Sequence, residues 1–328
     1  MRFHRLVGTA AVVAVCATAG VVLPAVADAN AAPARIAKSV KVGTMRTDIV
    51  VASPTMGKRV SVSVLTPRVD RGPRPTVYLL DGNDAAGGVS DWMSKGGIRS
   101  FFADKNVNVV VPRDAAGTFY TNWRKHDPKI GKPQWETFLT TELPPLINKQ
   151  FNGTGRAALI GVSMGGQGAF ALLSRHPNLF TGAASISGCP PVSGPLNQAY
   201  VRTTVAKSGG NADNMWGPPG SKLWVAHDPL THLNALRGKN LFLSAGSGAI
   251  GPPDLLPQPK SDLPEDAVTA SASALELGAY RCSLEFALQL RQAGIAYNDG
   301  FRIIGTHRWE YFRGDLPAAW ATVSRGLW

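Results

Sequence analysis

The stretch Ala157-Ala-Leu-Ile-Gly-Val-Ser-Met-Gly-Gly166 decides the fold of this chain. Its first four residues are apolar and predict a buried strand, whereas Gly166–Arg175 predicts a helix. Between the two lies Gly161-Val-Ser163-Met-Gly165, a G-x-S-x-G motif, which in this context indicates a sharp turn that presents the serine hydroxyl. The motif needs its glycines because a side chain at Gly161 or Gly165 would collide with the neighbouring strand or helix. We therefore expect Ser163 to be a nucleophile.

Further apolar runs recur along the chain at intervals that leave room for helices. Continuous apolar runs are typical of parallel strands covered on both faces, and their alternation with helices predicts an α/β fold with a mostly parallel central sheet. No low-complexity linker divides the chain, so we expect no separate cap domain. The runs are Thr76–Leu80, Val107–Val111, Ala183–Ser187 and Asn240–Ser244, preceded by extended segments at Val40–Ser53 and Arg59–Thr66. The predicted helices include Trp135–Phe151, with a bend at Pro144-Pro145, and also Asp262–Ala293 and Leu316–Leu327.

Composition bounds the class of protein. The 328 residues are 44% hydrophobic and 17% charged, which is typical of a folded domain and excludes a disordered chain. Lys and Arg number 34 against 22 Asp and Glu, so the formal charge is +12. The basic residues are scattered and form no nucleic-acid motif. We therefore expect no nucleic-acid partner, and we favour an anionic cell envelope as the surface that this charge meets.

The N-terminus has the three parts of a secretory signal. Arg2 and Arg5 precede an apolar run from Leu6 to Val26, and small residues follow as far as Ala32. We expect residues 1–31 to be removed, which leaves 32–328 as a single secreted domain. Cys189 and Cys282 then remain in a compartment that permits disulfides. An even pair favours one disulfide, and two buried free thiols are the alternative.

A serine nucleophile needs a general base and an acid that holds the base. Of the six histidines, His307 alone follows a strand-like run, Phe301–Ile304, and lies in a loop before the last helix, so it is the expected base. The residue pattern leaves the acid open. A position soon after the strand Asn240–Ser244 favours Asp254, and the other candidates are Asp262, Glu265, Asp266 and Glu276. The backbone N–H of Met164, at the start of the helix, is expected to face a developing oxyanion.

Several motifs are too long and too particular to arise by chance. They include Leu79-Leu-Asp-Gly82, Phe119-Tyr-Thr-Asn-Trp123, Trp135-Glu-Thr-Phe-Leu139, Asn211-Ala-Asp-Asn-Met-Trp-Gly-Pro218 and Gly305-Thr-His-Arg-Trp-Glu-Tyr311. Together with the serine motif, they resemble the secreted mycolyltransferases, the antigen 85 group and its corynemycolyl relatives. The resemblance runs from about Val77 to Trp309 and implies an α/β-hydrolase fold.

The resemblance also implies roles for individual residues. The family's acid lies on a helix well before the histidine, a register that favours Glu276 over Asp254. The second oxyanion donor is expected to be the backbone N–H of Asn83. Asp81 and Trp309 are expected to contact the sugar of the substrate.

Two departures from the family lie near the expected acceptor site. The family's Arg is Asp84 here, and the Ser after the histidine is Arg308. These exchanges leave the identity of the acceptor open, and we expect Arg308 to contact substrate. Trp216, in a Gly/Pro-rich segment above the sheet, is expected to form a substrate wall. We also expect a disulfide between Cys189 and Cys282 to pin the helix that carries the acid to the sheet.

The expected activity is acyl transfer through a Ser163 acyl-enzyme. The donor is expected to be an acylated trehalose glycolipid and the acceptor a second sugar or wall arabinan, with no metal or organic cofactor and with the protein acting as a monomer. A secreted carboxylesterase, in which water takes the acyl group, shares every catalytic residue and is the first alternative. A non-catalytic envelope-binding member of the fold is the second, and the presence of Ser163, Glu276 and His307 argues against it.

Overall fold

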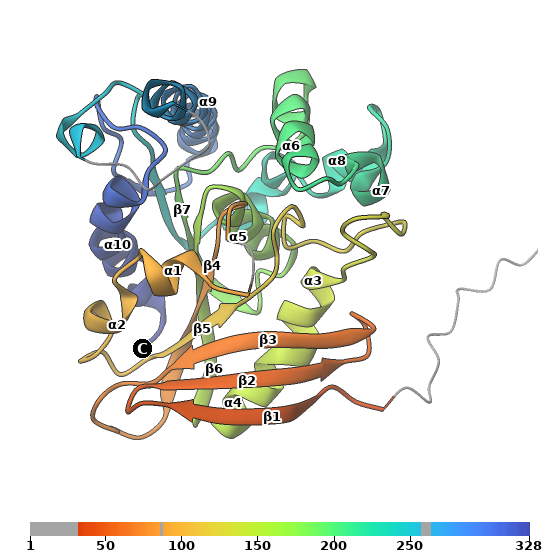
Figure 1. Cartoon of the computed structure of the whole chain (residues 1–328), viewed down its shortest axis with the longest axis vertical. Coiled ribbons are helices and arrows are strands. Elements are labelled where there is room, and N and C mark those ends of the chain that lie inside the picture. Colours follow the sequence, from red (N-terminus) through yellow and green to blue (C-terminus); the bar gives the residue numbers. More distant parts are fainter. Residues whose placement is uncertain (1–31, 86–87, 257–263) are drawn as a thin grey trace, which may run out of the picture. The chain divides into compact units, whose positions relative to one another are not determined.

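A nine-stranded sheet lies at the centre of the computed structural model (Figure 1). The structure describes residues 32–85, 88–256 and 264–328, so the expected secretory signal lies outside the described residues. Pro33–Trp328 form one compact unit. Its strands are β1 (Arg35–Val42), β2 (Arg46–Ser53), β3 (Lys58–Leu65), β4 (Arg74–Leu80), β5 (Asn108–Pro112), β6 (Gly153–Val162), β7 (Phe180–Ile186), β8 (Asn240–Ser244) and β9 (Asn298–Asp299).

The strand order is β1-β2-β3-β5-β4-β6-β7-β8-β9. All pairs from β5 to β9 are parallel, whereas β1, β2 and β3 join antiparallel at one side. The five predicted apolar runs coincide with β4 to β8, so the prediction of a mostly parallel α/β sheet is confirmed. The carboxyl ends of parallel strands meet at one edge of a sheet, and the loops after β4, β6, β7 and β8 therefore gather there.

Helices cover both faces of the sheet (Figure 1). They are α1 (Asp91–Ser94), α2 (Ile98–Phe101), α3 (Trp135–Thr137), α4 (Leu143–Gln150), α5 (Met164–Arg175), α6 (Pro195–Lys207), α7 (Ala212–Trp216), α8 (Lys222–Ala226), α9 (Glu265–Gln292) and α10 (Trp309–Val323). A π-helical segment, η1 (Phe138–Glu142), and the 3₁₀ segments η2 (Pro229–Leu236), η3 (Pro252–Leu255) and η4 (Ser324–Gly326) complete the helical elements of the described residues.

Two hydrophobic cores hold these layers to the sheet. On β4, Tyr78 and Leu80 belong to the core that includes side chains of α3, α4, α5, α6 and α9. The alternate residues, Val77 and Leu79, belong to the core shared with α1, α2 and α10. Successive side chains of a strand point to opposite faces, so one apolar run supplies both cores.

The predicted strand Phe301–Ile304 is the clearest difference from expectation. The strand β9 is shorter and earlier, and the predicted run contributes only a single bridge between Arg302 and Gly246. Ile303 is 85% exposed, so this apolar run is not a buried strand. The segment that leads to His307 is therefore a loop for most of its length.

Helix limits also differ from the predicted ones. The last helix, α10, begins at Trp309 and carries Pro317 inside it, and α9 runs without interruption past Gly278. The bend expected at Pro144-Pro145 is replaced by the π-helical turn η1, after which α4 begins with proline in its first turn. Proline is tolerated there because the first N–H groups of a helix have no partner within it.

Candidate active site

Ser163 stands at the turn between β6 and α5. Its backbone has φ 53° and ψ −122°, a conformation that residues with side chains rarely adopt. The turn is tight, since a Cβ on Gly161 would lie 2.0 Å from the Gly165 carbonyl oxygen. A Cβ on Gly165 would lie 2.3 Å from the carbonyl oxygen of Leu80 on β4. The two glycines therefore let helix and strand close around the serine.

His307 contacts both other members of the expected triad. Its Nε2 lies 3.0 Å from Ser163 Oγ, and its Nδ1 lies 2.7 Å from Glu276 Oε2. If Nδ1 donates its proton to the carboxylate, Nε2 is free to accept the proton of the serine hydroxyl. The structure therefore brings the three side chains into the order and spacing of a nucleophile, a base and an orienting acid.

Glu276 is held by groups that the sequence reasoning missed. It lies on α9, and its side chain is fully buried. Its Oε1 accepts hydrogen bonds from Ser187 Oγ at 2.7 Å and from the Gly246 N–H at 2.6 Å. Ser187 follows β7 and Gly246 follows β8, so the carboxyl ends of two parallel strands supply the donors. Their positions directly after two predicted parallel strands could have identified them, because the carboxyl ends of parallel strands lie at the same edge of the sheet.

The other acid candidates lie elsewhere. Glu265 and Asp266 begin α9 and are exposed, and Asp262 lies outside the described residues. Asp254 is buried, and its carboxylate contacts Thr306 and Tyr311. Of the candidates that the structure describes, Glu276 is the one that faces the imidazole.

Two backbone segments lie close to the serine. Met164 is the first residue of α5, and N–H groups of a first helical turn have no partner within the helix. The chain after β4 passes close by, since a Cβ on Gly82 would lie 3.4 Å from Ser163 Cβ. The next residue, Asn83, is fixed by its side chain, whose Oδ1 accepts from the Gly117 N–H at 2.7 Å and from Ser208 Oγ at 3.0 Å. The backbone at Met164 and near Asn83 therefore lies close to the nucleophile.

Ser163 and His307 line a cavity of about 630 Å³. One part of its wall is apolar and another is polar or charged. A cavity of this size and mixed character suits a ligand with an apolar chain and a polar head. The apolar residues include Val162, Val268, Leu275 and Phe312, and the polar ones include Asp84, Asp91, Lys207 and Arg313.

Trp309 and Arg308, both expected at the substrate site, line this cavity. The Trp309 ring packs edge-on against Trp92 with ring centroids 5.1 Å apart, and its Nε1 lies 3.3 Å from Asp91 Oδ2. The Arg308 side chain is only 10% exposed and donates to the Pro253 carbonyl oxygen at 2.9 Å. Asp84, expected near the acceptor site, pairs with Lys207 at 2.8 Å.

Tyr200 on α6 is a further cavity residue that the sequence reasoning missed. Its side chain interacts with Ser163, and burial raises the pKa of Tyr200 to about 12. The hydroxyl is therefore neutral at ordinary pH. Nothing in the residue pattern marks it, because α6 follows no motif.

Asp81, expected to contact sugar, does not line the cavity. Its side chain is buried, and Oδ1 accepts a hydrogen bond from the Trp92 N–H at 3.1 Å, near the start of α1. Burial raises the pKa of this carboxyl to about 7. In this structure Asp81 is therefore not placed to contact a sugar in the cavity. Its buried carboxyl instead holds the start of α1 against the end of β4.

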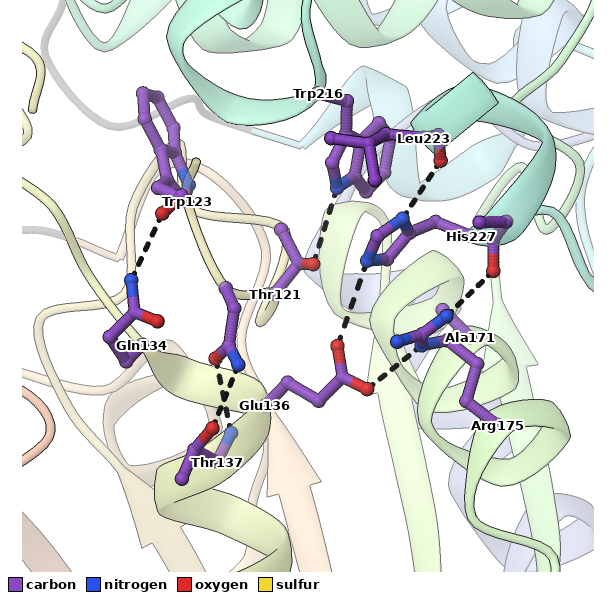
Figure 2. Close-up of polar contacts among 12 residues, drawn as sticks. Thr121, Trp123, Gln134, Glu136, Thr137, Ala171, Arg175, Trp216, Leu223 and His227 are labelled. Carbon is purple, nitrogen blue, oxygen red and sulfur yellow. Dashed lines mark hydrogen bonds and ion pairs between the residues drawn. The ribbon is translucent and has the colours of Figure 1, made fainter. Parts of the chain in front are cut away.

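Trp216 is not a substrate wall either, because its side chain is fully buried. Figure 2 shows it beside His227, on which it stacks with ring centroids 4.9 Å apart. His227 Nε2 lies 3.7 Å from Glu136 Oε2, and Arg175 Nε donates to Glu136 Oε1 at 2.8 Å. Trp216 therefore belongs to a buried cluster that ties the segment between β7 and β8 to the C-terminal end of α5. Neighbouring glycines and prolines suggested a loop above the sheet, but the indole packs against Phe119, Trp224 of α8 and His227.

Cys189 and Cys282 form a disulfide with their Cα atoms 5.3 Å apart. Cys189 lies just after β7, and Cys282 lies on α9 beyond Glu276. The bond therefore fastens the helix that carries Glu276 to the central sheet.

Among the residues that the structure describes, no group of three or more His, Cys, Asp and Glu side chains is arranged to hold a metal ion. No helix within the described ranges is both long and apolar enough to span a bilayer.

Comparisons with known proteins agree on one family. Residues 53–323 match the family described as putative esterase. The diacylglycerol acyltransferase/mycolyltransferase Ag85B of Mycobacterium intracellulare is 32% identical over 257 residues, which are 74% of this chain and 73% of that protein. The MPT51/MPB51 antigen of Mycobacterium bovis is 36% identical over 196 residues. That match spans 59% of this chain and 62% of the antigen, less than two thirds of its length.

Solved structures give the same result for the fold. The crystal structure of Mycobacterium tuberculosis MPT51 (FbpC1) superposes with a TM-score of 0.70 at 28% identity, covering 85% of this chain and 97% of that one. An S-formylglutathione hydrolase from Agrobacterium tumefaciens superposes with a TM-score of 0.65 at 17% identity, covering 89% and 99%. The second likeness shows the α/β-hydrolase fold alone.

Proposed function

Because the chain belongs to the esterase family, together with the Ag85 acyltransferases, we propose that it is a secreted serine acyltransferase. It moves a long-chain acyl group from a trehalose glycolipid to a sugar hydroxyl. The observation that carries this proposal is the hydrogen-bonded series Ser163, His307 and Glu276 at the wall of a cavity with both apolar and polar residues. We propose that residues 1–31 direct export and are then removed, so that the mature domain reaches the cell envelope, where its basic charge favours an anionic surface.

In the first half-reaction, Ser163 Oγ attacks the carbonyl carbon of the donor ester while its proton passes to His307 Nε2. Glu276 Oε2 accepts from Nδ1 and stabilises the imidazolium. The N–H groups of Met164 and Asn83 are proposed to hold the oxyanion of the tetrahedral intermediate. Its collapse breaks the ester bond, the imidazolium returns the proton to the departing sugar oxygen, and an ester on Ser163 remains.

In the second half-reaction, a sugar hydroxyl gives its proton to His307 and attacks the acyl-enzyme. Collapse of the second tetrahedral intermediate breaks the bond to Ser163 Oγ, which takes the proton back from His307, and the acylated sugar is released. The apolar residues Val268, Leu275 and Phe312 are proposed to lie along the acyl chain. Trp309 and Arg308 are proposed to border the polar part of the substrate.

Hydrolysis is the second candidate, and the match to the esterase family favours it. Water would take the place of the sugar hydroxyl in the second half-reaction, with every residue otherwise in the same role. The two activities differ only in how well a sugar competes with water for the acyl-enzyme.

Product analysis decides between these activities. The mature protein is incubated with a long-chain trehalose monoester, and acylated sugars and free acid are quantified. We expect transfer to exceed hydrolysis, and Ser163→Ala to lower both by at least about 10³-fold. Free acid alone would establish the esterase alternative. Unchanged turnover by Ser163→Ala would refute the mechanism for both.

A further inference from the structure

Asp254 is a buried carboxylate for which the proposed reaction has no direct use. It lies in η3, in the loop that follows β8. Its Oδ1 accepts a hydrogen bond from Thr306 Oγ1, and its Oδ2 accepts from Tyr311 Oη at 2.7 Å and from the Gly251 N–H at 2.9 Å. The guanidinium Nη1 of Arg308 lies 3.6 Å from Oδ1.

The partners of Asp254 frame His307 in the sequence. Thr306 directly precedes the base and is fully buried, and Arg308 directly follows it. Arg308 is held a second time by its hydrogen bond to the Pro253 carbonyl oxygen at 2.9 Å. One carboxylate and its neighbour in the chain thus fasten the residues on both sides of the imidazole.

This fastening matters because the base lies outside regular secondary structure. The backbone of its loop is held by hydrogen bonds to other loops and to α9, from Gly305 N to Ala249 O at 2.7 Å and from His307 N to Ala272 O at 3.0 Å. A general base must stay within hydrogen-bond reach of the serine, and a displacement of about 1 Å can cost about 10²-fold in rate.

The charge of Asp254 is also suited to this task. Burial alone would raise its pKa, but hydrogen bonds from Gly251, Thr306 and Tyr311, with the nearby Arg308, lower the pKa below its ordinary value. The carboxylate therefore stays ionised and keeps its acceptor oxygens for all of these donors.

We propose that Asp254 is a positioning residue, which sets the place of His307 by holding Thr306 and Arg308 on either side of it. The inference rests on the proposed function in one respect only, that His307 is the base. Glu276 orients the imidazole ring from behind, whereas Asp254 fixes the loop that carries the ring.

The test compares two variants of Thr306, one that removes its hydroxyl and one that keeps it. Thr306→Val keeps the shape of the side chain but loses the donor to Asp254, and Thr306→Ser keeps the donor. Rates of acylation by a p-nitrophenyl ester are measured for both, with Asp254→Asn as a second disruption. We expect Thr306→Val and Asp254→Asn to lower kcat by about 10- to 100-fold with KM changed less than about threefold. Thr306→Ser should recover most of the loss.

Glu136→Gln is the matched control. It disrupts a buried, ion-paired carboxylate at the opposite end of α5 (Figure 2), so it should lower the free energy of unfolding but leave kcat unchanged. If Glu136→Gln lowers kcat as much as Asp254→Asn, the effect is general loosening and the proposal is overturned. Wild-type kcat in folded Thr306→Val and Asp254→Asn overturns it as well.

A second readout does not depend on turnover. The proton shared by His307 Nδ1 and Glu276 is observed by ¹H NMR at low field, and we expect its resonance to shift or broaden in Asp254→Asn and Thr306→Val but not in Glu136→Gln. A wild-type protein that shows this resonance yet acylates no ester would refute the proposed function while still testing Asp254. An unchanged resonance in both loop variants would refute the positioning role.

Discussion

His307 meets Glu276 through one carboxylate oxygen only, Oε2 at 2.7 Å from Nδ1, while Oε1 is occupied by Ser187 and Gly246. This division fixes the carboxylate plane, because each oxygen has its own donors. A glutamine at position 276 would have to point its NH₂ group at one of these donors, where it could accept no hydrogen bond. The buried position gives it no water as an alternative partner.

Glu276→Gln should therefore lower kcat by about 10³- to 10⁴-fold while the protein remains folded, since the neutral amide can neither fix the imidazole tautomer nor stabilise the imidazolium. Steady-state hydrolysis of a soluble ester, with circular dichroism to check folding, measures this. Ser187→Ala, which removes one of the two donors to Oε1, should cost far less. Equal activity of Glu276→Gln and wild type would mean that another carboxylate supports the base.

Tyr200→Phe tests the hydroxyl that shares the cavity with the nucleophile. We expect the neutral phenol to donate to Ser163 Oγ, which gains negative character as its proton leaves for His307. Its removal should lower kcat by about 2- to 10-fold, the equivalent of about 0.5–1.5 kcal/mol for one hydrogen bond. Pre-steady-state acylation kinetics isolate this step. A faster acylation in Tyr200→Phe would show instead that the bond stabilises the resting serine.

The disulfide closes a long segment of chain. Cys189 and Cys282 are 93 residues apart, a separation for which a crosslink is expected to contribute about 4 kcal/mol to the free energy of unfolding. The double variant Cys189→Ser/Cys282→Ser should show this loss in urea denaturation, and its kcat should fall because α9 also carries Glu276. Intact mass should rise by about 2 Da on reduction of the wild type. No mass change would show that the two thiols are free.

Asp81 should make the free energy of unfolding fall as pH rises, the opposite of the usual effect of a carboxylate whose pKa is lowered by folding. Its pKa is about 7 in the folded protein because of burial, against an ordinary value of 3.8. Between these values the folded state holds the proton more tightly than the unfolded state, so the contribution of Asp81 to stability falls as pH rises and is level above the folded pKa. Each pKa unit corresponds to about 1.4 kcal/mol, so the fall amounts to a few kcal/mol.

Asp81→Asn removes this titration while keeping a side-chain oxygen for the Trp92 N–H. Urea denaturation at intervals from pH 4.5 to pH 8 should therefore show that the difference in stability between variant and wild type shifts toward the variant as pH rises. Parallel curves for the two proteins would contradict the raised pKa.

The sheet and the serine turn could be predicted because each depends on residues close together in the sequence. A strand buried on both faces must be apolar throughout, and a turn as tight as that at Ser163 requires glycine at Gly161 and Gly165. The acid was less accessible to such reasoning. Glu276 and Asp254 are both carboxylates after β8, and only the way in which α9 and η3 pack decides which of them faces the imidazole.

Errors arose where tertiary contacts overrode local patterns. The apolar run Phe301–Ile304 resembled a strand, but Ile303 points to solvent. Trp216 was expected to form a substrate wall because of its Gly/Pro-rich neighbours, yet its indole is fully buried against His227, Trp224 and Phe119. Tyr200 could not be found from spacing, whereas Ser187 and Gly246 could be suspected only from their positions after two parallel strands.

The positive φ of Ser163 has a cost that extends beyond catalysis. A φ of 53° with ψ of −122° suits glycine better than serine. The wild-type protein is therefore less stable than it would be with glycine at position 163, and it gains an exposed hydroxyl there. Ser163→Gly should consequently melt at a higher temperature than the wild type while remaining inert, and Ser163→Ala should gain little. Evolution toward greater thermal tolerance is thus opposed at this position by selection for activity.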